Sequence, residues 1–408
     1  MSTGSVLGSV TLAYEAIWNQ WRQCAGVRLL VEPNRDIALS GAHLLAALSE
    51  LWPAKQGALL VRPANAALLF ELLSQAPVPG LWIEAPHQWL QDARFAAQAR
   101  QAGQRGVPVV WSGEPGQSPT PDVLRSLHTA VRALTHQEAL VALRTSLHQH
   151  QSTRVGAQAS RASPVHPGAL YEGLASAALV DHALDHQGAL GVVGWPTDEV
   201  LHGYRFKQIQ PAHALVMAMV QAIDADASLD SLERQLGHEP LLTYRYLRYA
   251  NSVAVGLPRE MDSVRHALMA MGYAQTRNWL MAQLPHASNE ANLNPIRSSM
   301  VVRARTMAQL ADAGMEEDLR REVFLCGVLS QVDLLLGEPL GPAIQRLPLT
   351  GRIVSALLGQ AGPYAPWLAI ASAQESGSAK LVRELCKAHG LSTEEVNRAL
   401  LRALAQKS

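Results

Sequence analysis

The pattern of apolar residues changes near residue 195, and this change limits what the chain can fold into. Before that point, short apolar runs of strand length alternate with longer helical patterns, which is typical of an α/β domain with a mainly parallel sheet. The strand-length runs lie at residues 27–32, 58–61, 81–84 and 107–111. After residue 200, apolar residues recur only at helical spacing. The sequence therefore predicts an α/β domain over residues 1–195 and an all-α domain over residues 200–408.

The composition excludes several classes of protein. A length of 408 residues predicts two or three domains. The 34 basic residues equal the 34 acidic ones and form no long basic run, so we expect no nucleic-acid partner. Three widely separated cysteines suit reduced thiols in a cytoplasm rather than disulfides. No apolar stretch approaches the roughly 18 to 20 residues of a membrane span, and the start lacks the features of a signal peptide. We expect a cytoplasmic protein without a membrane partner.

The most specific stretch of the second half is residues 241–272, LLTYRYLRYANSVAVGLPREMDSVRHALMAMG. A helix breaks at Asn251 and Ser252, and a turn follows from Gly256 to Pro258. Asp262 is placed to cap a second helix. The stretch carries no arrangement of catalytic groups, which favours a module that works by contact.

This stretch resembles the signature of HDOD domains, which are related to HD and HD-GYP phosphohydrolases but lack their catalytic residues. The chain keeps the signature residues Arg248, Asn251, Ser252, Gly256, Pro258, Asp262 and Arg265. It departs from the signature at Val255, where an aromatic residue is usual, and at Glu239, where an aspartate is usual.

Residues 324–333 resemble the helix that carries the His-Asp doublet in true HD enzymes. The two doublet positions hold Ser330 and Gln331 in this chain. A hydroxyl and an amide cannot replace an imidazole and a carboxylate around a pair of metal ions. The resemblance therefore implies no catalytic residue, metal or cofactor in the helical half.

Two arginines of the signature helix lie at i and i+3, Arg245 and Arg248. They form either an exposed stripe that contacts a protein partner or a solvated face paired with nearby acids.

Residues 12–18, LAYEAIW, resemble the segment that names EAL domains, which are cyclic diguanylate phosphodiesterases that bind two divalent cations through carboxylates and an asparagine. Glu15 matches the motif glutamate and Glu84 a later strand glutamate. The other ligand positions are lost, near residues 61–62, 111–112, 128–134 and 157–160. Between Asp122 and Glu172 the only acidic residue is Glu138. The resemblance implies a degenerate EAL-like barrel without metal, and the missing Gln-Pro-Ile strand leaves open an incomplete barrel.

One other pattern in this half allows a metal. Asp181-His182 and Asp185-His186 recur at i and i+4, which suits either a shared metal or a solvated helix face. His148 and His150 point apart on a helix and do not suit a shared metal.

These features predict a non-catalytic signalling protein of the EAL-HDOD type that binds an unidentified protein partner. Its link to cyclic diguanylate comes from the resemblance alone. One alternative is an enzyme, either a residual cyclic diguanylate phosphodiesterase or a divergent HD phosphohydrolase. Another is a binding-only receptor for cyclic diguanylate, against which the loss of polar pocket residues argues.

Overall fold

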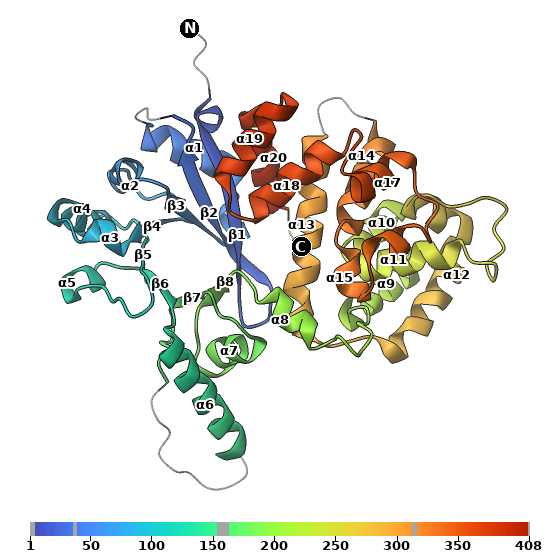
Figure 1. Ribbon diagram of the computed structural model, residues 1–408, viewed down its shortest axis with the longest axis horizontal. Coiled ribbons are helices and arrows are strands. Elements are labelled where there is room, and N and C mark those ends of the chain that lie inside the picture. Colours follow the sequence, from blue (N-terminus) through green and yellow to red (C-terminus); the bar gives the residue numbers. More distant parts are fainter. Residues whose placement is uncertain (1–4, 36–38, 153–162, 312–315, 407–408) are drawn as a thin grey trace. The chain divides into compact units, whose positions relative to one another are not determined.

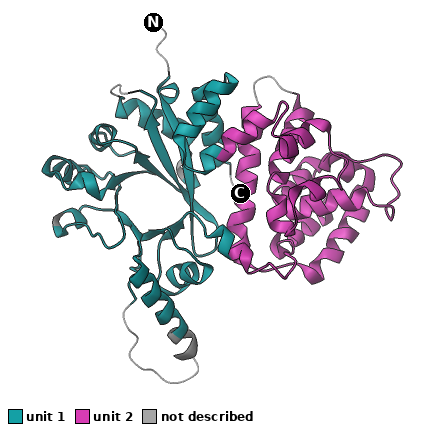
Figure 2. Ribbon diagram, viewed as in Figure 1, with its two compact units in different colours: residues 1–199, 373–407 teal, residues 200–372, 408 magenta. Residues whose placement is uncertain are grey.

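Two compact units divide the chain (Figure 2). The barrel unit joins residues 1–199 with residues 373–407, and the helical unit comprises residues 200–372. The computed structural model describes residues 5–35, 39–152, 163–311 and 316–406, without the side chains of residues 54, 122 and 148–152. The predictions for His148, His150 and residues 157–160 therefore lie outside the described residues.

Eight strands close into a barrel in the order of the chain (Figure 1). β1 is antiparallel to β2 and β8, and all other neighbours pair in parallel. The strands are β1 (Val10–Trp18), β2 (Cys24–Pro33), β3 (Ala58–Pro63), β4 (Leu81–Pro86), β5 (Val109–Ser112), β6 (Thr129–Ala133), β7 (Leu170–Glu172) and β8 (Gly191–Val193). The predicted α/β barrel followed by a helical region is confirmed. The barrel is also complete, because the described strands close the ring.

Alternating side chains build two layers around the barrel wall. The interior apolar layer comes from six strands and consists of Ile17, Leu60, Val110, Val131, Leu170 and Val193. Helices cover the outside, and polar caps such as Ser40, Asn65 and Asp92 fix where three of them begin. These helices are α1 (Gly41–Leu51), α2 (Ala66–Leu73), α3 (His87–Leu90), α4 (Ala93–Gln104), α5 (Pro121–Leu124), α6 (His136–Ser152) and α7 (Ala177–Asp181).

The last two helices belong to the barrel unit (Figure 2). α19 (Ala379–His389) and α20 (Thr393–Leu404) pack against β1 (Figure 1). The buried Asn397 amide donates to the carbonyls of Leu7 (2.7 Å) and Val10 (2.8 Å) and accepts from the Leu12 N–H (3.0 Å). The predicted helical domain over residues 200–408 thus differs from the observed unit. The reason is that the apolar stripes of α19 and α20 pack against the barrel, and the amide of Asn397 hydrogen-bonds to it.

The helical unit contains ten helices or parts of helices within the described residues. They are α9 (His213–Asp224), α10 (Leu229–Gly237), α11 (Pro240–Ala250), α12 (Val264–Gln283), α13 (Asn294–Leu310), α14 (Glu317–Leu329), α15 (Val332–Leu336), α16 (Leu340–Ile344), α17 (Gly351–Gly359) and α18 (Ala365–Glu375). α8 (Thr197–His202) contains the division between the units. Gly272 interrupts α12 at φ 69°, a backbone conformation that glycine adopts without strain. Across the described residues, none of the helices has the length and apolar character needed to cross a membrane.

Candidate functional site

An arginine inside the barrel is surrounded by three glutamates. Arg28 of β2, Glu84 of β4 and Glu172 of β7 each stand in register with a residue of the interior apolar layer. Because register partners share a face of the sheet, all three side chains point into the barrel. Glu15 of β1 is the direct register partner of Arg28 across the β1–β2 pair. We call these four residues the Arg28 cluster.

The Arg28 guanidinium binds carboxylates from three other strands. Its Nε donates to Glu84 Oε2 at 2.6 Å, and its Nη2 donates to the second oxygen of the same carboxylate. Its Nη1 donates to Glu172 Oε2 at 2.5 Å and to Glu15 Oε2 at 3.2 Å. The bidentate pair with Glu84 is the strongest geometry available to an arginine and a carboxylate. The cluster therefore links β1, β2, β4 and β7 through one cation.

Burial makes this ion network costly to break. Arg28 is 1% exposed and Glu84 is 0% exposed, whereas Glu15 and Glu172 are partly open to solvent. Burial by itself would lower the pKa of Arg28, but the charges of Glu84, Glu172 and Glu15 raise it above its ordinary value. The guanidinium is thus fixed in its charged form.

The donor set does not fit the divalent cations of an EAL enzyme. Such cations need carboxylate oxygens with free lone pairs pointing at one point. Here both Glu84 oxygens face Arg28, and Arg62 adds a second positive charge 3.7 Å from Glu84 Oε1. Within the described part of the chain, no group of three His, Cys, Asp or Glu residues is arranged to hold a metal ion.

The sequence predicted two members of this cluster and missed the other two. Glu15 and Glu84, expected as remnants of a metal site, do converge, but on Arg28. Glu172 joins them from β7, and Arg62 stands near the expected asparagine position. The signal for Arg28 was its place in an otherwise apolar run, Val27 to Val31, where alternation puts it opposite Val27 and Leu29.

The two Asp-His pairs surround another arginine. Arg22 Nη2 donates to Asp181 Oδ1 at 2.5 Å, and its Nη1 donates to Asp185 Oδ1 at 2.5 Å. His182 is fully buried, and its ring stacks on His186 with 6.2 Å between centroids. Burial and then the nearby His186 lower the pKa of His182. Both aspartates thus neutralise Arg22, which favours an ion pair over the shared metal that the spacing also allowed.

In the helical unit, Asn251 holds the signature loop closed. Its Nδ2 donates to the carbonyls of Leu247 (2.8 Å) and Met261 (2.9 Å), and its Oδ1 accepts from the Met261 N–H (2.7 Å). Gly256 has φ 65°, which explains why glycine stands at this turn.

The remaining signature residues lie along this loop and at the start of α12. Ser252 is half-buried and Pro258 is exposed. The predicted cap at Asp262 is off by one residue, since Ser263 accepts from the His266 N–H and Asp262 instead faces the His266 ring at 3.2 Å.

The two arginines of the expected stripe have different surroundings. Arg245 donates to Gln210 Oε1 at 2.8 Å and to the Ile209 carbonyl at 2.9 Å. Burial lowers the pKa of Arg245 despite the charge of Glu239. Arg248 is exposed. Arg245 therefore anchors the start of the helical unit, and only Arg248 remains available to a partner.

The positions of the lost doublet serve as a helix end. Ser330 ends α14, where its hydroxyl donates to the Gly327 carbonyl at 2.7 Å and accepts from Arg303 Nη1 at 3.3 Å. Gln331 begins α15 without a side-chain cap.

A cavity of about 690 Å³ opens in the helical unit between α10, α12, α14 and α17. We call it the α12–α14 cavity. Phe324, Leu325 and Val328 provide apolar side chains to its lining. The signature residues Asp262 and Arg265 lie on its rim, so the HDOD-like stretch opens into it. The volume is in the range of sites that bind small molecules or anchor side chains.

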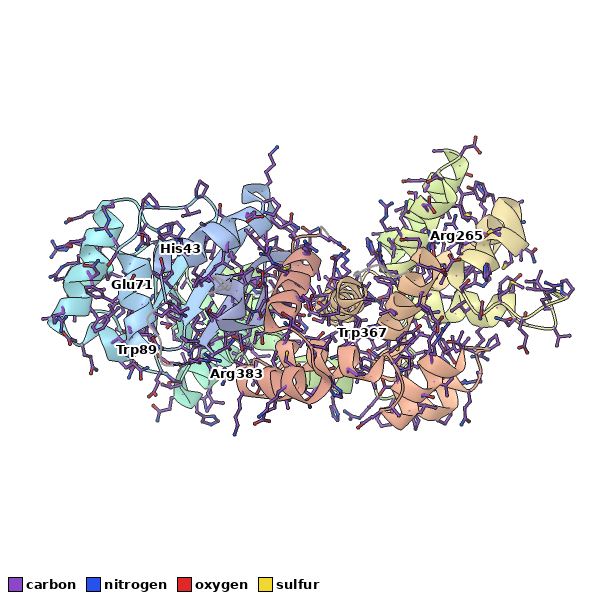
Figure 3. The ribbon with its side chains drawn as sticks, turned by 90° about the horizontal axis from the view of Figure 1, so that it is seen from above. His43, Glu71, Trp89, Arg265, Trp367 and Arg383 are labelled. Atoms are coloured by element: carbon purple, nitrogen blue, oxygen red, sulfur yellow. The ribbon has the colours of Figure 1, made fainter. Side chains whose placement is uncertain are left out.

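Acids outnumber bases around this cavity. Its lining holds seven carboxylates and four guanidinium groups. Arg265, labelled in Figure 3, pairs with Asp230 and with Glu233 (3.2 Å to Oε2). Arg321 of α14 bonds the same Glu233 oxygen at 3.3 Å and Asp318 at 2.9 Å. Burial raises the pKa of Glu233, which opposes the effect of both arginines.

One known family model matches part of the helical unit. The HDOD domain model matches residues 210–338, which lie within the helical unit.

Two curated relatives share part of the sequence. The cyclic di-GMP phosphodiesterase CdgJ of Vibrio cholerae is 22% identical over 198 residues, which cover 48% of this chain and 46% of that protein. The uncharacterized protein YuxH of Bacillus subtilis is 26% identical over 177 residues, which cover 42% of this chain and 41% of that protein. The chain thus spans less than half the length of the curated relatives it matches.

Solved structures match at lower similarity. The MmoQ response regulator of Methylococcus capsulatus is 20% identical, with a TM-score of 0.39 over 47% of this chain and 98% of that one. The EAL enzyme Bd1971 in its cGMP-bound form is 12% identical, with a TM-score of 0.31 over 46% of this chain and 61% of that one. From the family match and the observed fold, the chain carries an HDOD domain at residues 210–338, and a closed eight-stranded α/β barrel begins before it in the sequence.

Proposed function

We propose that this protein is a non-catalytic regulator in cyclic diguanylate signalling that acts in the cytoplasm by contacting another protein. The observation that carries the proposal is the Arg28 cluster. A phosphodiesterase of the EAL type needs carboxylates free to hold divalent cations. In this barrel, both oxygens of Glu84 accept hydrogen bonds from Arg28.

The signalling context rests on the relatives. One relative is named as a cyclic di-GMP phosphodiesterase, and the shared segment covers about half of this chain. The HDOD domain supports a role by contact, because the doublet positions Ser330 and Gln331 supply a helix end rather than metal ligands.

The α12–α14 cavity is the surface that best suits a partner. Its apolar side, with the half-buried Phe324, suits apolar side chains. Its rim has an excess of carboxylates, among them Glu317 and Asp318, which are 57% and 86% exposed. By charge complementarity, the partner segment should carry lysines or arginines beside apolar residues.

The absence of catalysis is tested by a hydrolysis assay. Purified chain is incubated with cyclic diguanylate and Mg²⁺ or Mn²⁺, alongside Glu15→Gln. We expect no turnover above the blank in either sample. Turnover by the wild type that disappears in Glu15→Gln would make the chain a phosphodiesterase.

The contact is tested with charge reversal in the cavity. A partner captured from host lysate is purified, and its affinity is measured for the wild type and for the double variant Glu317→Lys, Asp318→Lys. The matched control is Glu260→Lys, an exposed acid outside the cavity lining. We expect the double variant to bind at least about tenfold more weakly and the control to bind normally. Equal affinity of all three proteins would remove the cavity as the contact site.

A further inference from the structure

The Arg28 cluster has the geometry of a binding site with its ligand in place. The guanidinium is the ligand: every nitrogen of its fork donates to a carboxylate oxygen, with Nε and Nη2 on Glu84 and Nη1 on Glu172 and Glu15. The three carboxylates come from three strands other than β2, so the site is preformed by the barrel rather than by the strand that carries Arg28.

The spacing of the carboxylates suits a guanidinium rather than a metal ion. The oxygens lie around the edge of a planar group, at 2.5 to 3.2 Å from different nitrogens for the Nε and Nη1 contacts. A divalent cation needs its oxygens within about 2.0 to 2.6 Å of one centre. Among the described residues, no three acids, histidines or cysteines meet that requirement.

We propose that the interior of the barrel holds a guanidinium-binding site occupied by the chain's own Arg28, and that removing this side chain makes barrel stability depend on an added guanidinium ion. The proposal goes beyond the proposed function, since it concerns the barrel alone and holds with or without a partner.

Electrostatics supplies the driving force for such binding. Among the described residues, Glu84 pairs with Arg28 and, at 3.7 Å, with Arg62, so removal of Arg28 leaves this fully buried carboxylate with Arg62 as its cationic neighbour. An uncompensated buried carboxylate is strongly destabilising, so the native state gains from any cation that fits. A ligand that binds only the native state multiplies the folding constant by one plus its concentration divided by Kd, which is about elevenfold at ten times Kd.

The experiment measures the Tm of the full chain by circular dichroism during titration with guanidinium chloride from zero to about 20 mM, far below denaturing concentrations. Arg28→Ala should gain stability saturably, and the wild type should not. Where Arg28→Ala does not fold, the readout is recovery of the folded spectrum on adding the same salt.

Two salts and two variants serve as controls. Sodium chloride at equal ionic strength and MnCl₂ should not reproduce the rise in Tm. Arg28→Lys should not respond, because its ammonium occupies the site. The double variant Arg28→Ala, Glu84→Gln should not respond either, because it lacks the buried charge. An Arg28→Ala protein that ignores guanidinium, or that responds equally to Mn²⁺, would overturn the proposal.

Discussion

Carboxylates and arginines gather in two regions of the molecule, and the regions differ in exposure. In the Arg28 cluster, Arg28 is 1% and Glu84 is 0% exposed, and both oxygens of Glu84 are occupied. At the α12–α14 cavity, Arg265 is 27% and Asp230 is 61% exposed, and the surrounding acids exceed the arginines.

This difference in exposure suggests a structural role for the Arg28 cluster and a binding role for the α12–α14 cavity. A buried pair cannot exchange partners without leaving a charge in a medium of low dielectric constant, so the Arg28 cluster acts as a structural link. Exposed pairs contribute little to stability and can exchange their partners for those of another protein. We therefore expect the functional surface in the helical unit rather than inside the barrel.

The largest expected effect is at the buried cluster. Arg28→Ala should lower the free energy of unfolding by about 3 to 5 kcal/mol, because it leaves Glu84 buried and charged. Urea denaturation followed by circular dichroism measures the change. Arg62→Ala is the control, since Arg62 is 38% exposed, and it should cost less than about 1 kcal/mol. Similar losses for both variants would erase the distinction between the two regions.

The next effect tests the extent of the barrel unit. Asn397→Ala should lower the free energy of unfolding by about 2 to 3 kcal/mol, because two buried carbonyls and one N–H lose their partner. Arg398→Ala, on the neighbouring surface of α20, should be nearly neutral. Hydrogen exchange of β1 gives an independent reading, and unchanged protection of β1 in Asn397→Ala would contradict the assignment of α20 to the barrel.

A partly buried pair in the helical unit makes stability depend on pH. His238 Nε2 lies 2.9 Å from Arg305 Nη2. Burial, then Arg305 and Arg234, lower the pKa of His238 to about 4. As the pH falls below about 6.5, the unfolded chain takes up a proton that the folded chain refuses, so native stability is lost down to about pH 4.

The test of this sign uses His238→Gln, which keeps an acceptor for Arg305. The variant should lose less stability on acidification, by on the order of 2 kcal/mol at pH 4, and should match the wild-type slope above pH 7. Parallel stability curves for the two proteins from pH 7 to pH 4 would show that His238 does not titrate in this way.

The smallest expected change in stability is at the cavity rim. Arg265→Ala should leave the urea midpoint within error of the wild type, because Asp230 is 61% exposed and Glu233 keeps Arg321 as a partner at 3.3 Å. Its expected effect is on the partner instead. Asp230 and Glu233 keep Arg321 but lose one cationic partner, so the cavity becomes more negative and binding of a basic segment should tighten. A clear loss of stability would show that the Arg265 ion pairs contribute to stability in the same way as the buried Arg28 cluster.

The order of the two folds could be read from the sequence, because it depends on periodicity. Strand-length runs before residue 195 and helical spacing after residue 200 predicted the barrel and the helical region. The four strand-length runs correspond to β2, β3, β4 and β5. Among the other strands, β7 and β8 have only three residues each, too few to show alternation. They exist because their neighbours in the ring supply hydrogen bonds.

Periodicity could not predict the features that depend on tertiary contacts. The amphipathic patterns of α19 and α20 showed that each helix buries one face, but not that β1 is what they cover. The EAL-like motif points to Glu15 and Glu84, which do converge inside the barrel. It does not point to their partner Arg28, and strand alternation alone does not predict its burial, because a charged residue in a strand is normally exposed. Burial of that arginine follows only from the carboxylates that surround it.

The barrel interior contains its own cation, Arg28, and we expect it to take up no metal. Calorimetric titration of the purified full chain with MnCl₂ tests this claim directly, with Glu15→Gln as the matched control. We expect no saturable heat in either protein. A stoichiometric Mn²⁺ site in the wild type that is lost in Glu15→Gln would contradict it.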